Sequence, residues 1–257
     1  MLVHAAIYEG KAKRVRRLEG GLAEIEFKDD VTAGNGQRHA VFLGKGILCC
    51  RMSELLLSYL QKEGTPTHLV RRVSDNVLLV REVDIIPLEV VVRFQVAGSL
   101  EKRTGLPHRT QCNPPIYELY FKRDDLGDPM INEDHVRMLG IATSDELQTI
   151  RSLALGAAQK LYDLLLRAQL ALVDLKFEVG KVSQQIVLAD EISADTCRLR
   201  DLRTGEVLDK DVFRQNLAEL IQAYREVLRR LEALPELQSL SFDKRAAACD
   251  ARSSDEV

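Results

Sequence analysis

Residues 171–191, ALVDLKFEVGKVSQQIVLADE, contain two runs that are typical of neighbouring β-strands. The first run covers residues 171–179 and the second covers 185–189, and both are rich in β-branched and large apolar side chains. Glycine readily marks a turn between such runs, so we expect the chain to reverse at Gly180. The stretch therefore predicts a hairpin whose strands carry charged residues into the fold.

The first strand of this hairpin alternates charged and apolar side chains. Asp174, Lys176 and Glu178 share one face, and the residues between them belong to the opposite face. An unpaired charge buried in an apolar region costs several kcal/mol, so these three groups need partners. A hydrated cation with a polyanionic ligand is one solution, and a sheet face open to water is the other.

The second strand ends in the carboxylates Asp190 and Glu191. Glu178 and Asp190 would share a Mg²⁺ ion through hard oxygen ligands. With the turn at Gly180, however, pairing leaves these two residues about four positions out of step, so a bulge or curled strand end is needed. The order of the segments also resembles protein kinases, where a D-L-K loop precedes a metal-binding aspartate, although this analogy is only one of sequence order.

Outward from this hairpin, the N-terminal part of the chain favours an antiparallel sheet. Short apolar runs alternate with turn signals, and Gly20-Gly21 is a hairpin candidate. Apolar residues spaced by three and four predict a helix over 46–63 that ends before Pro66. Residues 88–93, LEVVVR, form the most strand-like segment of the chain.

The C-terminal part mixes irregular and helical patterns. Four prolines and an acidic run between Gly98 and the next helix predict a long functional loop. Thr143 and Glu146 form a capping-box pattern that opens a long amphipathic helix. A last helix is expected over about 211–233, followed by a frayed tail from Pro235.

Composition excludes several classes of protein. The chain has 257 residues, with 36 Lys and Arg against 39 Asp and Glu and a net charge of −3. This balance gives no bulk attraction to nucleic acid or anionic membranes, so we expect neither as a partner. The 5 cysteines show no C-x-x-C spacing, and we find neither a signal-peptide pattern nor a membrane-spanning run. The expected location is therefore the cytoplasm.

Three further segments suit anionic ligands. In Gly10-Lys11-Ala12-Lys13 the glycine permits close approach of a phosphate and the lysines supply charge, although a solvated hairpin edge is the alternative. Arg93 leads into the small-residue turn 97–99, which suits a phosphate monoester or is an ordinary strand exit. Arg198 offers a planar fork for phosphate or carboxylate, or forms a surface ion pair.

These segments occur in an order that is shared with a known family. In chain order they are YEGKAK (8–13), KDD (28–30), GKG (44–46), PTH (66–68), IIPLEVVVR (85–93), AGS (97–99), LGDP (126–129), INEDH (131–135), DLKFE (174–178), LADEIS (188–193) and DTCRL (195–199). Together they resemble the SAICAR synthetase family over nearly the whole chain, from Tyr8 to about Leu231.

The resemblance implies an α+β fold of two lobes, kinase-like or ATP-grasp-like. An antiparallel nucleotide-binding lobe would cover residues 1–88, a mixed α+β lobe for substrate and metal 89–234, and a flexible tail 235–257. The implied reaction is a carbon–nitrogen ligation that joins carboxyaminoimidazole ribotide to L-aspartate, with ATP and Mg²⁺ as cofactors. The implied assembly is a homodimer.

The resemblance also implies roles for individual residues. Catalytic roles fall on Lys176 and Asp174, and metal ligation on Glu178 and Asp190. The implied nucleotide contacts are Lys11, Ala12, Lys13, Val83, Ile85, Lys122, Glu178 and Asp190. The implied contacts to the ribotide are Arg93, Ser99, Asp128, Lys176 and Arg198.

The chain departs from the usual family pattern at a few positions. Phe94 and Cys49-Cys50 stand where asparagines are usual, Gly34 and Val179 where phenylalanine is usual, and Arg200 where tryptophan is common. None of these changes removes a charged residue with an implied role, so they bear on affinity and on aspartate placement. Two alternatives stay open, a kinase for a small molecule or protein and a catalytically silent nucleotide-binding module.

Overall fold

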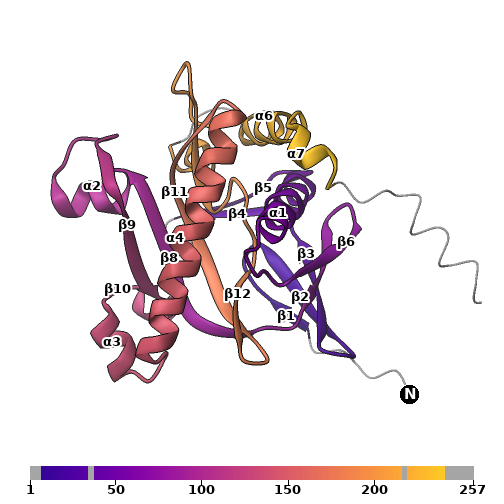
Figure 1. The fold of residues 1–257 in the computed structure, drawn as a ribbon. Coiled ribbons are helices and arrows are strands. Elements are labelled where there is room, and N and C mark those ends of the chain that lie inside the picture. The colour runs from indigo at the N-terminus through magenta and orange to yellow at the C-terminus, as the bar shows by residue number, and fades with distance from the viewer. Residues whose placement is uncertain (1–6, 34–37, 216–218, 241–257) are drawn as a thin grey trace, which may run out of the picture.

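Two antiparallel sheets form the framework of the chain (Figure 1). The computed structural model describes residues 7–33, 38–215 and 219–240. The first sheet has the order β1 (Ile7–Glu9), β2 (Lys13–Leu18), β3 (Leu22–Phe27), β7 (Val77–Arg81) and β6 (Leu69–Ser74). The second has the order β10 (Met130–Ile131), β9 (Gln111–Phe121), β8 (Asp84–Gln95), β11 (Leu170–Val182) and β12 (Gln185–Ala189), and β13 (Cys197–Asp201) also pairs with β11.

The first sheet follows the sequence expectations closely. Gly20 and Gly21 form the turn between β2 and β3 with positive φ angles of 75° and 71°, a conformation that favours glycine. The expected helix is α1 (Lys45–Lys62), which packs on β3, β6 and β7. A small third sheet pairs β4 (Asp30–Ala33) with β5 (Arg38–Val41). Gly34 lies outside the described residues.

The second sheet is covered by the long helix α4 (Ser144–Arg167), which crosses β11 and β8 (Figure 1). The predicted capping box is confirmed, because the Thr143 side chain accepts from the Glu146 amide and the Glu146 carboxylate accepts from the Thr143 amide. The apolar face of α4 packs against the sheet, with most of its residues buried and Leu153 partly buried, as its 3.6-residue period predicts.

The expectation of a long irregular loop after Gly98 is wrong. This region contains α2 (Ser99–Thr104), β9, η1 (Asp124–Leu126), β10 and α3 (Glu133–Met138). Proline usually excludes a central strand because it lacks an amide donor. Pro114 and Pro115 are accommodated because the pairing of β8 with β9 is interrupted there, between the Arg93–Ile116 and Gln95–Gln111 pairs.

The C-terminal expectations need correction. Instead of one helix over 211–233, the structure has α5 (Asp211–Arg214) and α6 (Leu220–Glu232), because Glu219 adopts a positive φ of 62° that starts a separate helix. The tail does not begin at Pro235. That residue opens α7 (Pro235–Gln238), whose Leu237 is buried in the core, and residues 241–257 lie outside the described part.

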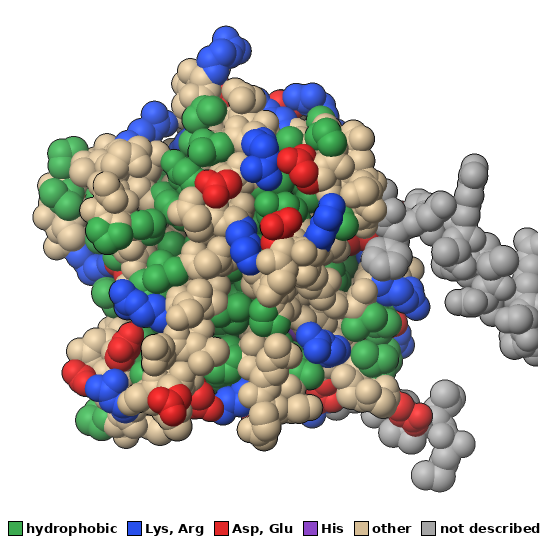
Figure 2. All heavy atoms as spheres, in the orientation of Figure 1, with side chains coloured by type: hydrophobic (Ala, Val, Ile, Leu, Met, Phe, Trp, Pro, Cys, Tyr) green, Lys and Arg blue, Asp and Glu red, His purple; other side chains and the backbone are tan. Residues whose placement is uncertain are grey.

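The change from the first sheet to the second falls between Arg81 and Asp84, a few residues before the expected boundary at residue 88. On the face shown in Figure 2, positive and negative side chains are interspersed rather than gathered by sign. No helix among the described residues is both long and apolar enough to cross a membrane.

Candidate active site

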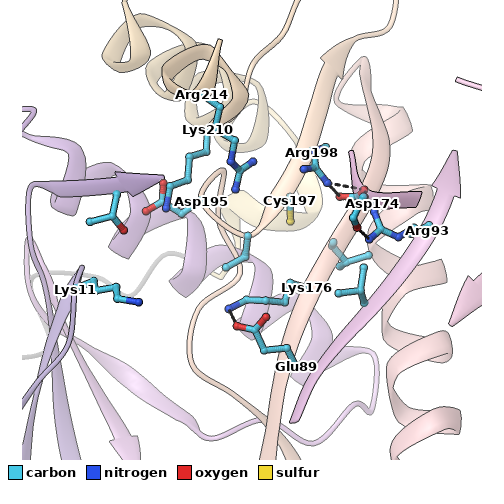
Figure 3. Close-up of a pocket in the computed structure, with 15 residues that line it drawn as sticks. Lys11, Glu89, Arg93, Asp174, Lys176, Asp195, Cys197, Arg198, Lys210 and Arg214 are labelled. Carbon is cyan, nitrogen blue, oxygen red and sulfur yellow. Dashed lines mark hydrogen bonds and ion pairs between the residues drawn. The ribbon is translucent and has the colours of Figure 1, made fainter. Parts of the chain in front are cut away.

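A cavity of about 390 Å³ lies between the two sheets, and its wall is mostly polar. Figure 3 shows Lys11 and Lys176 approaching it from opposite sides, and it shows one group of charged side chains around Asp174 and another around Asp195. Six of the predicted site residues line it: Lys11, Arg93, Ser99, Asp174, Lys176 and Arg198. Asp174, Lys176 and Glu178 of the first hairpin strand each form ion pairs. Their face of the sheet is therefore not simply open to water.

Arg93 and Arg198 converge at one end of the cavity. Arg93 Nη1 donates to Asp174 at 2.7 Å, and Arg198 Nη1 donates to the same carboxylate at 2.9 Å. Arg93 Nη2 also donates to the Ser99 hydroxyl at 3.0 Å, and its Nε donates to Glu118 at 2.7 Å. This candidate oxyanion site has two guanidinium groups and a hydroxyl on one wall, groups whose chemistry suits an oxyanion.

The strand register explains this arrangement. Asp174 of β11 lies directly opposite Arg93 of β8 and opposite Arg198 of β13, so three strands deliver their side chains to one point. Phe94 belongs to the other face, where its ring stacks on Tyr162 of α4 at 4.4 Å between centroids. Phe94, which departs from the usual family pattern, therefore packs in the core and does not line the cavity.

Lys176 occupies the middle of the cavity wall. Its ammonium donates to Glu89 at 2.7 Å and lies 3.6 Å from Glu178. Burial alone lowers the pKa of this lysine, but the carboxylates of Glu178 and Glu89 outweigh that effect and raise it above its usual value. Lys176 is therefore a fixed positive charge rather than a base.

The β11–β12 hairpin differs from the sequence expectation in its turn. The chain reverses at residues 183–184, so that Glu178 pairs with Ala189 and lies next to Asp190 in the register. Gly180 is inside β11, where an added Cβ would come within 2.4 Å of Val83 Cγ1. The glycine is needed for this close approach and not for a turn, and the expected offset between Glu178 and Asp190 is wrong.

Asp190 and Glu178 each have a lysine partner in a cluster beside the cavity. Lys13 donates to Asp190 and, at 2.9 Å, to Glu191. Lys122 donates to Glu178 at 2.5 Å. Burial favours the neutral form of Glu178, but Lys176, Lys122 and Lys13 hold its pKa below the usual value. The result is a cluster of carboxylates with hard oxygen donors, which fits the chemistry of a Mg²⁺ ion.

The remaining predicted residues do not line the cavity. Ala12 lies between Lys11, which lines the cavity, is half exposed and pairs with Asp124 at 3.0 Å, and Lys13, which does not line it. Val83 and Ile85 flank the start of β8 beside Gly180. Asp128 accepts from the Arg123 amide at 2.9 Å and stabilises a turn, so the predicted contact to the ribotide has no support in the cavity geometry.

Several cavity residues were missed by sequence reasoning. Glu89 precedes Arg93 by four positions on β8, so strand alternation in LEVVVR was a usable signal for it. Asp195 belongs to the quoted motif DTCR, in which only the arginine was assigned a role. Lys210 precedes α5 and Arg214 ends it, and nothing in their local sequence indicated that this segment folds over the cavity.

Asp195 is held by buried groups behind the cavity wall. The Tyr224 hydroxyl of α6 donates to its Oδ1 at 2.5 Å, and Lys45 of α1 donates to its Oδ2 at 2.8 Å. The thiol of Cys49 lies within 4.8 Å of Asp195 and Glu191. Burial raises the pKa of Cys49 well above its usual value, so the thiol is neutral and poorly suited to Mg²⁺.

Two sheets with a polar cavity between them, a candidate oxyanion site on its wall and a lysine–carboxylate cluster farther along β11 define a two-lobed α+β enzyme. Comparison with protein families gives a match to the model described as SAICAR synthetase over residues 6–231. The chain therefore belongs to the SAICAR synthetase family.

Individual relatives agree with this assignment. The chain is 49% identical over 230 residues to the phosphoribosylaminoimidazole-succinocarboxamide synthase of Anoxybacillus flavithermus, covering 89% of this chain and 96% of that protein. It is 47% identical over 234 residues to the enzyme of the same name from Thermococcus sibiricus, covering 91% and 100%. A solved SAICAR synthetase in complex with ADP superposes with a TM-score of 0.87 at 45% identity, covering 89% and 98%.

Proposed function

We propose that the chain condenses 5-amino-1-(5-phospho-D-ribosyl)imidazole-4-carboxylate with L-aspartate to give SAICAR in purine biosynthesis, with cleavage of ATP to ADP and phosphate. Family membership, the names of relatives that match along their whole length, and the related structure with ADP support this reaction. The single observation that carries it is the row of side chains from Arg198 through Asp174 and Lys176 to Glu178. In this row, which runs from β13 along β11, the arginine end would suit an oxyanion and the Glu178 end would suit the nucleotide phosphates and their cation.

The reaction needs an activated carboxylate, because a carboxylate oxygen is a poor leaving group. An oxygen of the imidazole carboxylate bonds to the γ-phosphorus of ATP, and the bond from phosphorus to ADP breaks. The amine of aspartate then bonds to the carboxyl carbon, phosphate leaves with the C–O bond pair, and the nitrogen loses a proton. Negative charge accumulates on the transferred phosphoryl group, so cations around it accelerate the reaction.

We assign the oxyanion site to the ribotide. Arg93, Ser99 and Arg198 would hold its phosphate or carboxylate, since their donors converge on one wall. Asp174 keeps the two guanidinium groups in place by accepting from both. Lys176 would face the reacting carboxylate, where its permanent charge offsets the charge that develops during phosphoryl transfer.

The lysine–carboxylate cluster around Glu178 and Asp190 suits the nucleotide. Lys11, Lys13 and Lys122 would contact the phosphates of ATP, and the segment 83–86 at the junction of the sheets would contact adenine. Glu178 and Asp190 would hold Mg²⁺, which neutralises phosphate charge when it is bound. Lys13 donates to Asp190 and Lys122 donates to Glu178, so each of these carboxylates has a lysine partner.

An assay of ADP release tests this proposal. We expect the purified chain to release ADP when the ribotide, aspartate, ATP and Mg²⁺ are all present, and to form SAICAR in equal amount. A stable phosphorylated product formed without aspartate would establish a kinase instead. Tight ATP binding without turnover on the ribotide would establish a silent binding module.

Two family expectations stay predictions: a homodimer and a cytoplasmic location. Sedimentation velocity of the full chain at micromolar concentration tests the first, and a dimer is the expected result. Fractionation of cells that express the chain from its native locus tests the second.

A further inference from the structure

The motif Pro66-Thr67-His68 joins the two sheets, a role that the proposed reaction does not use. On one side, the Leu188 amide of β12 donates to the Pro66 carbonyl at 3.0 Å, and the His68 amide donates to the Leu188 carbonyl at 2.9 Å. On the other side, the Arg81 amide of β7 donates to the His68 carbonyl at 2.8 Å. Residues 66–68 are thus hydrogen-bonded to both sheets at the end of β12.

The residue just beyond this end of β12 has an unusual backbone. Asp190 has a φ of 63°, in the left-handed region that side chains other than glycine seldom adopt. Such a conformation costs of order 1–3 kcal/mol and persists only where the surroundings enforce it. The same residue presents its carboxylate to Lys13 of the first sheet.

The imidazole of His68 contacts this strained backbone directly. Its Nε2 lies 3.0 Å from the carbonyl oxygen of Asp190, and because a carbonyl only accepts, Nε2–H is the donor. His68 is 2% exposed, so the bond is shielded from water. The carbonyl belongs to the peptide that links Asp190 to Glu191, and its direction sets how both side chains leave the backbone toward Lys13.

We propose that His68 is a positioning residue for the metal-binding end of the site. Its imidazole holds the Asp190 peptide in the left-handed conformation and thereby aims the Asp190 carboxylate at the nucleotide phosphates and their cation. The inference rests on the proposed function, because it takes Asp190 as a ligand of Mg²⁺. Partners that orient the ligands of a metal typically contribute about 10- to 100-fold to its affinity.

A matched pair of substitutions separates this role from simple filling of the core. His68→Gln places an amide donor near the position of Nε2, whereas His68→Asn places it near Nδ1, too short to reach the Asp190 carbonyl. Gln61→Met is the control, because Gln61 donates to the neighbouring Leu69 carbonyl at 2.8 Å and does not touch Asp190. Asp190→Asn reports the role of the carboxylate itself.

The readout is the dissociation constant of ADP, measured by calorimetry in Mg²⁺ and again in EDTA, with thermal unfolding of each variant. For His68→Asn we expect affinity in Mg²⁺ to fall about tenfold, with affinity in EDTA within about twofold of the parent. His68→Gln and Gln61→Met should retain the Mg²⁺-dependent gain, and Asp190→Asn should lose it.

The outcomes distinguish the inference from its premise. If Asp190→Asn loses the Mg²⁺-dependent gain while His68→Asn behaves like Gln61→Met, the positioning role of His68 is wrong and the metal site stands. If Asp190→Asn keeps the gain, the metal assignment is wrong and the inference is overturned with it. The positioning role of His68 would also be overturned if His68→Gln lost the Mg²⁺-dependent gain in ADP affinity to the same extent as His68→Asn.

Discussion

The guanidinium of Arg93 and the carboxylate of Asp174 are joined across β8 and β11 by a hydrogen bond of 2.7 Å, and both side chains are buried at the cavity wall. The two residues are direct partners in the strand register. A buried pair of this kind fixes the direction of the guanidinium, whose other N–H groups donate to Glu118, the Ala97 carbonyl, Ser99 and Tyr120. The oxyanion end of the site therefore depends on the register of these strands.

Arg93→Lys tests this dependence. Lysine keeps the charge but lacks the planar fork that bonds Asp174, Glu118 and Ser99 together. Loss of a partner in a buried charge pair costs about 2–5 kcal/mol, so we expect kcat/KM for the ribotide to fall at least about 30-fold. Steady-state kinetics measure this loss, and ADP affinity should be unchanged. Equal losses for ribotide and ADP would contradict the assignment of this end to the ribotide.

Lys176→Gln tests the charge in the middle of the cavity. Neighbouring carboxylates keep Lys176 protonated, so the variant removes a positive charge. Glutamine is also a linear polar side chain, so we expect the fold to be unchanged. Loss of one preorganised electrostatic group typically lowers kcat by about 100- to 1,000-fold, and we expect that range. Single-turnover measurements would give the rate, and calorimetry with ADP should give an affinity within about threefold of the parent. Lys176→Arg, which keeps the charge, should retain more activity than Lys176→Gln.

Gly180→Ala tests the close approach between β11 and the segment that leads into β8. The new Cβ would lie 2.4 Å from Val83 Cγ1 and 2.6 Å from the Asp84 carbonyl oxygen, so backbone must shift. We expect the free energy of unfolding to fall by about 1–3 kcal/mol, as for other overpacked sites.

Gly156→Ala is the matched control for this substitution. Gly156 is exposed within α4, and an added Cβ meets nothing within 4 Å. The same chemical change should therefore raise the free energy of unfolding by about 0.5–1 kcal/mol through helix propensity. Urea denaturation measures both, and a loss at Gly156 or a gain at Gly180 would contradict the geometry.

Asp201→Asn tests a carboxylate that ties β13 to α6. The Thr204 amide donates to Asp201 at 2.6 Å and Arg230 donates to it at 2.5 Å, and these bonds lower the pKa of Asp201 below its usual value. A carboxyl group with a lowered pKa in the folded state contributes stability above its unfolded pKa, and the contribution is lost as pH falls.

We therefore expect Asp201→Asn to be less stable than the parent at pH 7, with the difference shrinking as pH falls below about 4. Urea denaturation at several pH values measures this. Asp75→Asn is the control, because the side chain of Asp75 is 68% exposed and should change stability by less than about 0.5 kcal/mol at any pH. A difference for Asp201→Asn that does not vary with pH would contradict the assigned pKa direction.

Local patterns in the sequence predicted a large part of the fold. The helices over 45–62 and 144–167, the capping box at Thr143 and the hairpin at Gly20-Gly21 depend on neighbours within a few residues, so periodicity and turn chemistry were sufficient. The separation of α5 from α6 was missed because the spacing of apolar residues in the sequence continues from one helix into the next. The backbone at Glu219, in contrast, has a positive φ and leaves the helical conformation.

For the site, alternation along one strand determined that Asp174, Lys176 and Glu178 share a face, and the order of motifs determined the family. Only the tertiary structure decided the register that sets Glu178 opposite Ala189, the crossing of residues 66–68 between the sheets, and the arrival of Lys210 and Arg214 at the cavity. The physical reason is that a side chain's direction follows from its own strand or helix. The partners of that side chain across a sheet or between lobes depend on contacts between segments that are far apart in the chain. Local sequence patterns do not predict such contacts.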